Sequence, residues 1–304
     1  MARLQLGLDA YSPREVAEKV RAVGVTKARL QFMQTAMLAV LAGLFIGLGA
    51  LFYTLVASDA AFGFAATRVL GGLVFSLGLI LVTVGGAELF TGNNLMVMAC
   101  ADRKITTLEL LRNWVIVYAG NAIGAIGLAV LVTLSGHGEM NGGAVATTYV
   151  KIAAAKTALP FGEAFFKGML CNILVCLAVW LAMAGHTVVD KILAIVFPIS
   201  AFVAAGFEHS VANMYFIPMG LLLADGAALP ASVNLASLSL GGFLSNLLPV
   251  TLGNIVGGSV MVAAVYYVIY RRPALVEQRT GEERTRESDF VADTTRSTDR
   301  QKPT

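Results

Sequence analysis

Charged side chains are scarce in this sequence: they make up 13% of its 304 residues, while 57% are hydrophobic and the mean hydropathy is +0.75. Soluble domains carry about a quarter charged residues, so this scarcity excludes an ordinary soluble globular protein. The charges that are present gather in residues 1–34, in short loops and beyond residue 270. Long, almost uncharged runs lie between them.

Cysteine is equally sparse. Cys100, Cys171 and Cys176 are odd in number, form no CxxC pair and lie in or beside apolar runs. This pattern excludes a disulfide framework and a cysteine metal site. We expect all three to be small core residues.

The motifs of common enzyme classes are missing: there is no HExxH, no GxSxG, no Walker sequence and no dinucleotide fingerprint. Of the three histidines, His137 and His186 fall in expected loops, and only His209 lies inside an apolar run. We therefore expect no enzymatic activity, no cofactor, no metal and no nucleic-acid partner.

Six apolar runs are long enough to cross a hydrocarbon core of about 30 Å as helices. The predicted spans are residues 35–57, 67–99, 113–134, 160–184, 191–223 and 246–270. Lysine and arginine residues precede the first span, lie in the loop between spans two and three, and follow the sixth span. The 224–245 loop has neither. Positive loops stay in the cytoplasm, so we predict a multi-pass protein of the inner (cytoplasmic) membrane with both termini cytoplasmic.

The two ends differ from the core. Ser12, Pro13 and Glu15 form a helix-start signature, and valines then recur at helical spacing among basic residues. Residues 1–34 are thus predicted to hold a cytoplasmic amphipathic helix, lying either on the membrane surface or against other cytoplasmic segments. Residues 271–304 are polar and are predicted to be a disordered cytoplasmic tail.

Spans two and five are longer than one crossing needs, and polar residues interrupt both. Glu88 and Asn93 interrupt the first, and Glu208 and Asn213 interrupt the second with the same spacing. An ionisable side chain inside a membrane helix costs about 2.5–3.5 kcal/mol on insertion scales. We therefore predict that both helices are broken near the membrane midplane.

Spans three and six also match each other. Asn113, Gly120, Asn121 and Gly124 recur with identical spacing as Asn246, Gly253, Asn254 and Gly257. The chain thus reads as two three-span halves, 35–134 and 160–270, joined by an extracytoplasmic linker, 135–159. An odd number of spans gives the halves opposite orientations, and an inverted repeat with paired broken helices is typical of transporters. A scaffolding protein would not need such breaks.

The breaks predict a path for an anion. Each second half-helix begins with N–H donors and a partial positive charge, which favour an anion. Four side chains are expected to cap these ends: Thr91, Asn93, Ser210 and Asn213. Glu88 and Glu208 would repel an anion, so we interpret them, with Asn93 and Asn213, as structural groups, each glutamate accepting hydrogen bonds from the opposite break. His209 is the candidate pathway residue, because an imidazole can donate a hydrogen bond to an anion or change its charge near neutral pH.

Five stretches together resemble the formate/nitrite transporter family, in family order and over residues 35–270. They are GAELFTGN (86–93), NW..VY.GN (113–121), KGMLCN..VCLAVW (167–180), GFEHSVANM (206–214) and PVT.GN (249–254). The resemblance implies an aquaporin-like, all-α membrane fold of six helices and a homopentamer with one pathway in each protomer.

The resemblance also implies residue roles. Thr91 and His209 would face each other across a central chamber, with Asn172 nearby, and Lys156 would lie in the outer vestibule and attract anions. Apolar constrictions would be formed by Phe75, Phe202, Leu79, Leu89, Phe90 and Val175.

The expected function is transmembrane transport of small monovalent anions. Formate is favoured, and nitrite, hydrosulfide, acetate and lactate remain alternatives. Desolvating an anion is costly, which leaves two mechanisms open. The anion could be neutralised by a proton from His209 or from water, making protons a second partner, or the constrictions could open to a hydrated anion.

Overall fold

All regular elements are helices in the computed structural model, which describes residues 10–59, 61–231 and 233–272. Six helical segments have the length and hydropathy of membrane spans, which confirms the predicted six-span, all-helical membrane fold. The spans are α2 (Phe32–Ala57), α3–α4 (Gly63–Phe75 and Leu77–Gly85), α7 (Thr107–Leu134), α9 (Phe161–Ala184), α10 (Val188–Ala205) and α12 with η4 and η5 (Leu240–Ile255, Val256–Ala264 and Tyr267–Arg271). The predicted disordered tail falls almost entirely on residues 273–304, outside the described residues.

Both predicted breaks are present. After α4 the chain has no regular secondary structure in residues 87–89 and then continues as α5 (Phe90–Asn93), η1 (Asn94–Met96) and α6 (Val97–Ala101). After α10 it is again irregular in residues 207–209 and continues as α11 (Ser210–Leu223). Gly86 (φ 81°) and Gly206 (φ 76°) end α4 and α10 in the left-handed conformation, which costs glycine no Cβ strain. Two chemically similar sequences therefore produce two similar breaks.

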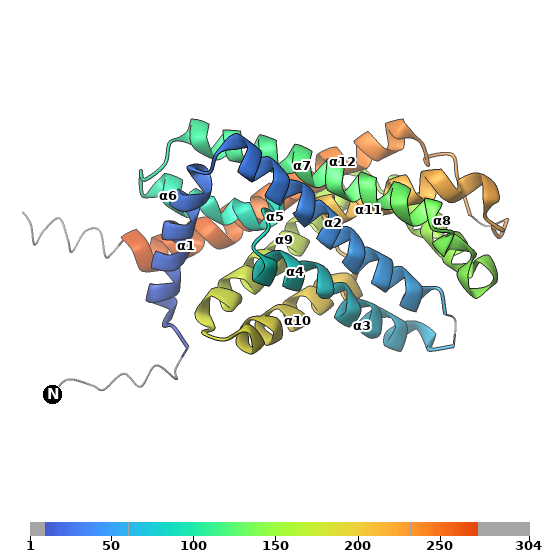
Figure 1. Ribbon diagram of the computed structural model, residues 1–304, viewed down its shortest axis with the longest axis horizontal. Coiled ribbons are helices and arrows are strands. Elements are labelled where there is room, and N and C mark those ends of the chain that lie inside the picture. The colour runs from blue at the N-terminus through green and yellow to red at the C-terminus, as the bar shows by residue number, and fades with distance from the viewer. Residues whose placement is uncertain (1–9, 60, 232, 273–304) are drawn as a thin grey trace, which may run out of the picture.

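A short helix precedes the first span of each half. α1 (Pro13–Ala28) begins at the predicted capping box of Ser12 and Glu15. α8 (Ala144–Thr157) lies within the stretch predicted as a linker, at the opposite end of the molecule from α1 (Figure 1). The buried face of α1, including Val16 and Val20, packs against a cluster that contains Leu95, Met98 and Trp180. Of the two placements left open by the sequence, the structure has α1 packed on other segments of the protein.

Close helix packing holds the breaks in position. A Cβ added at Gly124 of α7 would lie 2.0 Å from the carbonyl oxygen of Val40, and one at Gly257 would lie 2.1 Å from that of Met169. Contacts this short leave no room for any side chain, so the backbones of α7 and α2, and of η4 and α9, meet directly. The repeated glycines therefore press each third span of a half against its first.

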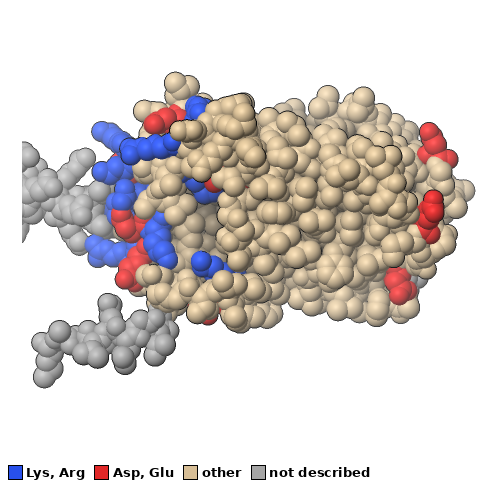
Figure 2. Space-filling model, viewed as in Figure 1, with Lys and Arg blue, Asp and Glu red and all other residues tan. Residues whose placement is uncertain are grey.

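The surface matches a membrane protein. Lysine and arginine gather at the end that carries α1, while the wide middle of the molecule is largely uncharged (Figure 2). Large apolar side chains on the spanning helices, such as Val115, Leu131 and Leu244, are more than half exposed. Cys171 and Cys176 are buried, as expected for core residues, and Cys100 is only partly buried.

Candidate transport pathway

Two cavities enter the protein, one from each end. The first, called the α8 cavity, has a volume of about 360 Å³, and its lining includes Arg68, Lys156 and His209. The second, called the α1 cavity, has a volume of about 240 Å³, and its lining includes Lys27 and Glu88. Both cavities end at a break.

A small apolar space separates the two cavities. It holds about 10 Å³ and is lined by Ile46, Phe75, Leu79, Leu89, Val175, Ile199, Phe202 and His209. The α8 cavity shares Phe75, Phe202 and His209 with it, and the α1 cavity shares Leu79 and Leu89. The three spaces therefore follow one another through the protein, with an apolar barrier in the middle.

Aromatic rings close the α8 side of this barrier. The rings of Phe75 and Phe202 meet edge to face with centroids 5.7 Å apart. The ring of Phe202 stacks on that of His209 at 6.0 Å. His209 is thus the one polar side chain among those that line the central space.

The bonds of His209 define its protonation. The backbone N–H of Ala212 donates to Nδ1 (3.1 Å), so Nδ1 carries no proton. The proton of the neutral ring is then on Nε2, which lies 2.9 Å from Thr91 Oγ1 and donates to it. Protonating Nδ1 would set two N–H groups against each other at the start of α11. The geometry therefore holds a neutral imidazole with its Nε2 proton directed across the two breaks.

Asparagines from the third span of each half bind the breaks. Asn121 Oδ1 accepts from the N–H of Phe90 (2.9 Å), and Asn254 Oδ1 accepts from that of Ser210 (3.0 Å). Their amide groups donate to the carbonyls of Glu88 (2.9 Å) and Glu208 (3.0 Å). Thr91, Asn93, Ser210 and Asn213 were predicted to cap the half-helices, and this was wrong. The N–H groups at the starts of the half-helices donate instead to Asn121, Asn254 and the ring of His209.

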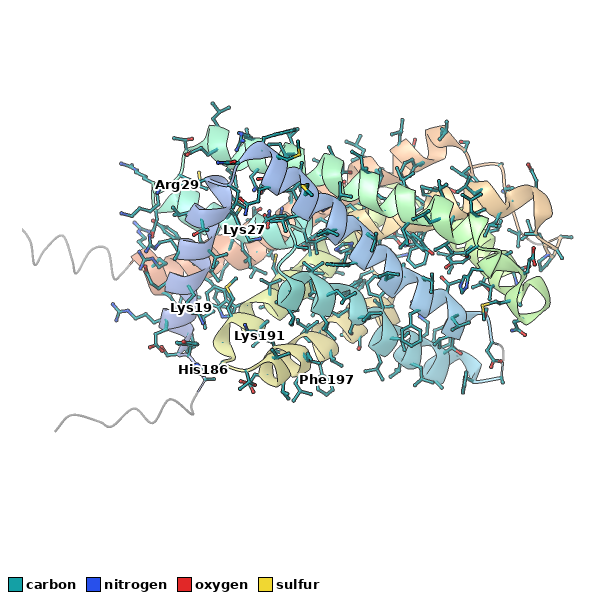
Figure 3. All side chains as sticks on the ribbon, viewed as in Figure 1. Lys19, Lys27, Arg29, His186, Lys191 and Phe197 are labelled. Carbon is teal, nitrogen blue, oxygen red and sulfur yellow. The ribbon has the colours of Figure 1, made fainter. Side chains whose placement is uncertain are left out.

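Glu88 is bound by side chains of its own half and of α1, the short helix that precedes it. Its carboxylate accepts from Lys27 Nζ (2.7 Å) and from Asn93 Nδ2 (2.7 Å), and Asn93 also donates to Asn113 Oδ1 (2.9 Å). Figure 3 shows Lys27 on α1, which supplies this cation.

Glu208 repeats the arrangement in the second half. Its carboxylate accepts from Lys156 Nζ (2.9 Å) and Asn213 Nδ2 (2.6 Å), and Asn213 also donates to Asn246 Oδ1 (2.7 Å). The expectation that each glutamate accepts from the opposite break was therefore wrong. The inverted repeat places the matching asparagine and lysine on the same side of the membrane as each glutamate.

Three expected pathway residues lie elsewhere. Asn172 lines none of the three spaces; its amide donates to the carbonyls of Thr91 (3.2 Å) and Asn254 (2.7 Å) and braces the first break against α12. The ring of Phe90 packs on Tyr118, with centroids 4.9 Å apart, rather than in the constriction. Thr91 reaches the pathway only through its bond to His209.

Lys156 and Leu79 line these spaces as expected, but the sequence analysis missed Lys27, Ile199 and Arg68. Lys27 and Lys156 each precede the first span of a half. A comparison of the two halves that included the residues before the spans would have matched these two lysines. Leu79 and Ile199 also occupy matching positions, ten residues before Leu89 and His209. Arg68, in the α8 cavity, has no basic counterpart in the other half and gave no repeat signal.

Replacing Lys156 by glutamine is expected to lower the thermal stability of the protein, since the Glu208 carboxylate, 6% exposed, would lose its only salt-bridge partner among the described residues. Removing one member of a buried ion pair costs about 3–5 kcal/mol. The double variant Lys156→Gln/Glu208→Gln should regain part of the lost stability, because no charge remains unpaired. Thermal unfolding in detergent checks this, and a double variant less stable than Lys156→Gln would contradict it.

Comparisons with known proteins agree with this architecture. Residues 14–268 match the family model described as "Formate/nitrite transporter". The chain is 40% identical over 273 residues to the formate channel FocA of Escherichia coli K12, covering 87% of this chain and 96% of FocA. It is 37% identical to a probable formate transporter of Methanothermobacter thermautotrophicus, covering 87% and 99%.

Solved structures show the same fold. A structure described as a pentameric formate channel with formate bound superposes with a TM-score of 0.71 at 40% identity, covering 79% of this chain and 97% of that one. An ion channel of the same family superposes at 0.73 with 29% identity, covering 84% and 98%. The protein is therefore a multi-pass membrane protein that belongs to the formate/nitrite transporter family.

Proposed function

We propose that this protein conducts formate through the three spaces described above, one pathway in each protomer. The observation that carries the proposal is a single hydrogen-bond donor, His209, at the apolar barrier where two cavities with cationic side chains end. The relatives named as formate channels support formate as the anion.

His209 would act as a neutral donor. An anion that reaches the barrier loses most of its water, which is costly unless a donor or a proton compensates the charge. Nε2–H can turn from Thr91 Oγ1 to the anion without any change in the bond at Nδ1. Because the ring is neutral, the proton that converts formate to formic acid would come from a hydronium ion in the aqueous cavity, which leaves a water molecule behind. Thr91 then holds the imidazole in place before and after passage.

The proposal includes the location of the protein in the membrane and its oligomeric state. The lysines and arginines at the α1 end support, by the positive-inside rule, a location in the inner (cytoplasmic) membrane with that end facing the cytoplasm (Figure 2). A homopentamer is supported by the pentameric relative and would cover part of the exposed apolar surface. Size-exclusion chromatography with light scattering tests the pentamer, and a monomeric particle would overturn it.

Flux into proteoliposomes tests the substrate. Formate and nitrite uptake are measured side by side with internal pH recorded, and protein-free liposomes serve as the control. We expect formate uptake to exceed nitrite uptake and to be accompanied by inward proton movement. Faster nitrite uptake would make nitrite the substrate, and formate uptake without proton movement would favour passage of the hydrated anion.

A further inference from the structure

The unneutralised positive charge at the mouth of the α8 cavity comes mainly from Arg68. Three cationic side chains line this cavity: Arg68, Lys156 and Lys167. Lys156 is paired with Glu208 at 2.9 Å, and Lys167 with Glu163 at 2.5 Å. The bonds described for Arg68 go instead to neutral oxygens, the carbonyl of Ala204 (2.9 Å) and the hydroxyl of Tyr53 (3.3 Å). Arg68 therefore brings a positive charge that these bonds do not neutralise.

The guanidinium is also held in a fixed orientation. Its Nε–H bond to Ala204 and its Nη1–H bond to Tyr53 tie it to α10 and α2, respectively. Its Nη2 lies 2.7 Å from the place where a Cβ on Gly206 would be, so the group rests directly over the backbone of the second break. These two bonds use two of its five N–H donors, so one Nη1–H and both Nη2–H groups remain, and one from each nitrogen can form a fork for two oxygens.

The α1 cavity has no residue equivalent to Arg68 among those that line it. Val188 stands as far before Glu208 as Arg68 stands before Glu88, so the repeat puts valine at the matching position. The cation and the carboxylate that line the α1 cavity, Lys27 and Glu88, are paired with each other at 2.7 Å. The linings of the two cavities thus differ by the unneutralised charge of Arg68.

We propose that Arg68 is the first binding group for the anion at the α8 mouth and that its planar fork favours planar two-oxygen anions over spherical ones. A cleft lined by one sign of charge concentrates counter-ions. A guanidinium can bond both oxygens of a carboxylate at once, which a chloride ion cannot reproduce. This inference rests on the proposed anion transport and adds the residue that recruits and selects the anion.

The test compares Arg68→Gln and Arg68→Lys with Lys151→Gln, which removes an exposed lysine on α8 that does not line the cavity. Initial formate influx is measured against formate concentration in vesicles that expose the α8 end outward, at low and high salt. For Arg68→Gln we expect the half-saturating concentration to rise roughly three- to tenfold at low salt, with maximal flux unchanged, and the difference to shrink at high salt. Arg68→Lys should keep the salt dependence but lose preference for formate over chloride as a competitor.

Two results would overturn the proposal. Arg68→Gln could behave like Lys151→Gln in half-saturation, or it could lower only the maximal flux, which would indicate a structural role for the bond to Ala204. An Arg68→Lys variant as selective as the original would refute the role of the planar fork. If the unaltered protein moves neither formate nor nitrite, the proposed function fails, and equilibrium dialysis of radiolabelled formate against the detergent-solubilised original and Arg68→Gln protein then decides the role of Arg68 separately.

Discussion

Replacing His209 by leucine is expected to reduce formate flux about 10- to 100-fold while leaving the fold intact. A hydrogen bond to a charged group contributes about 1.5–3 kcal/mol, which corresponds to this loss when the donor disappears at the barrier. Leucine should be tolerated because Leu89 already occupies the equivalent place, directly after Glu88 in the first break. The measurement is formate uptake into proteoliposomes containing equal amounts of protein.

Two further variants make this prediction specific. His137→Leu removes a histidine that lines none of the described spaces and should leave flux near normal. His209→Gln keeps an N–H donor but no titratable ring, so a neutral-donor role predicts partial flux with proton movement preserved. Loss of proton movement alone in His209→Gln would show that the ring itself delivers the proton. Normal flux in His209→Leu would mean that the histidine is only a packing residue.

Replacing Asn254 by leucine is expected to produce a large loss of stability. Its side chain bonds the N–H of Ser210 at 3.0 Å and the carbonyls of Gly168 at 2.8 Å and Glu208 at 3.0 Å. Each buried backbone group left without a partner costs about 1–3 kcal/mol, and the membrane core supplies no water to replace the bond. We expect a loss of about 3–5 kcal/mol, measured as thermal unfolding in detergent, and a collapse of flux because the second break loses its anchor.

The repeat provides the matched control for this prediction. Asn121 makes the corresponding bonds to Phe90, Ala39 and Glu88, so Asn121→Leu should destabilise the protein by a similar amount. Asn234, which is exposed in the loop after α11, bonds only the nearby N–H of Ala236 among the described residues, and Asn234→Leu should have little effect. If Asn254→Leu were as stable as Asn234→Leu, the breaks would be held by something other than these asparagines.

The amino-acid sequence by itself determined the membrane class, the six spans, the two breaks and the depth of His209. Each depends on a local pattern, because a helix that crosses lipid needs a long apolar run and cannot carry Glu88 or Glu208 without a reason. The matching glycines and asparagines of the third and sixth spans were visible for the same reason: identical spacing on two helices is a property of the chain alone.

Only the tertiary structure decided the partners of these residues. Whether Glu88 bonds across the break or within its half depends on where α1 delivers Lys27, a contact between residues far apart in the chain. The packing of Phe90 on Tyr118, the bracing role of Asn172 and the position of Arg68 over Gly206 likewise follow from how separate helices pack. The length of an apolar run determines which segments enter the membrane. It does not determine how each helix is rotated about its own axis. The specific hydrogen bonds and close contacts between helices select one rotation.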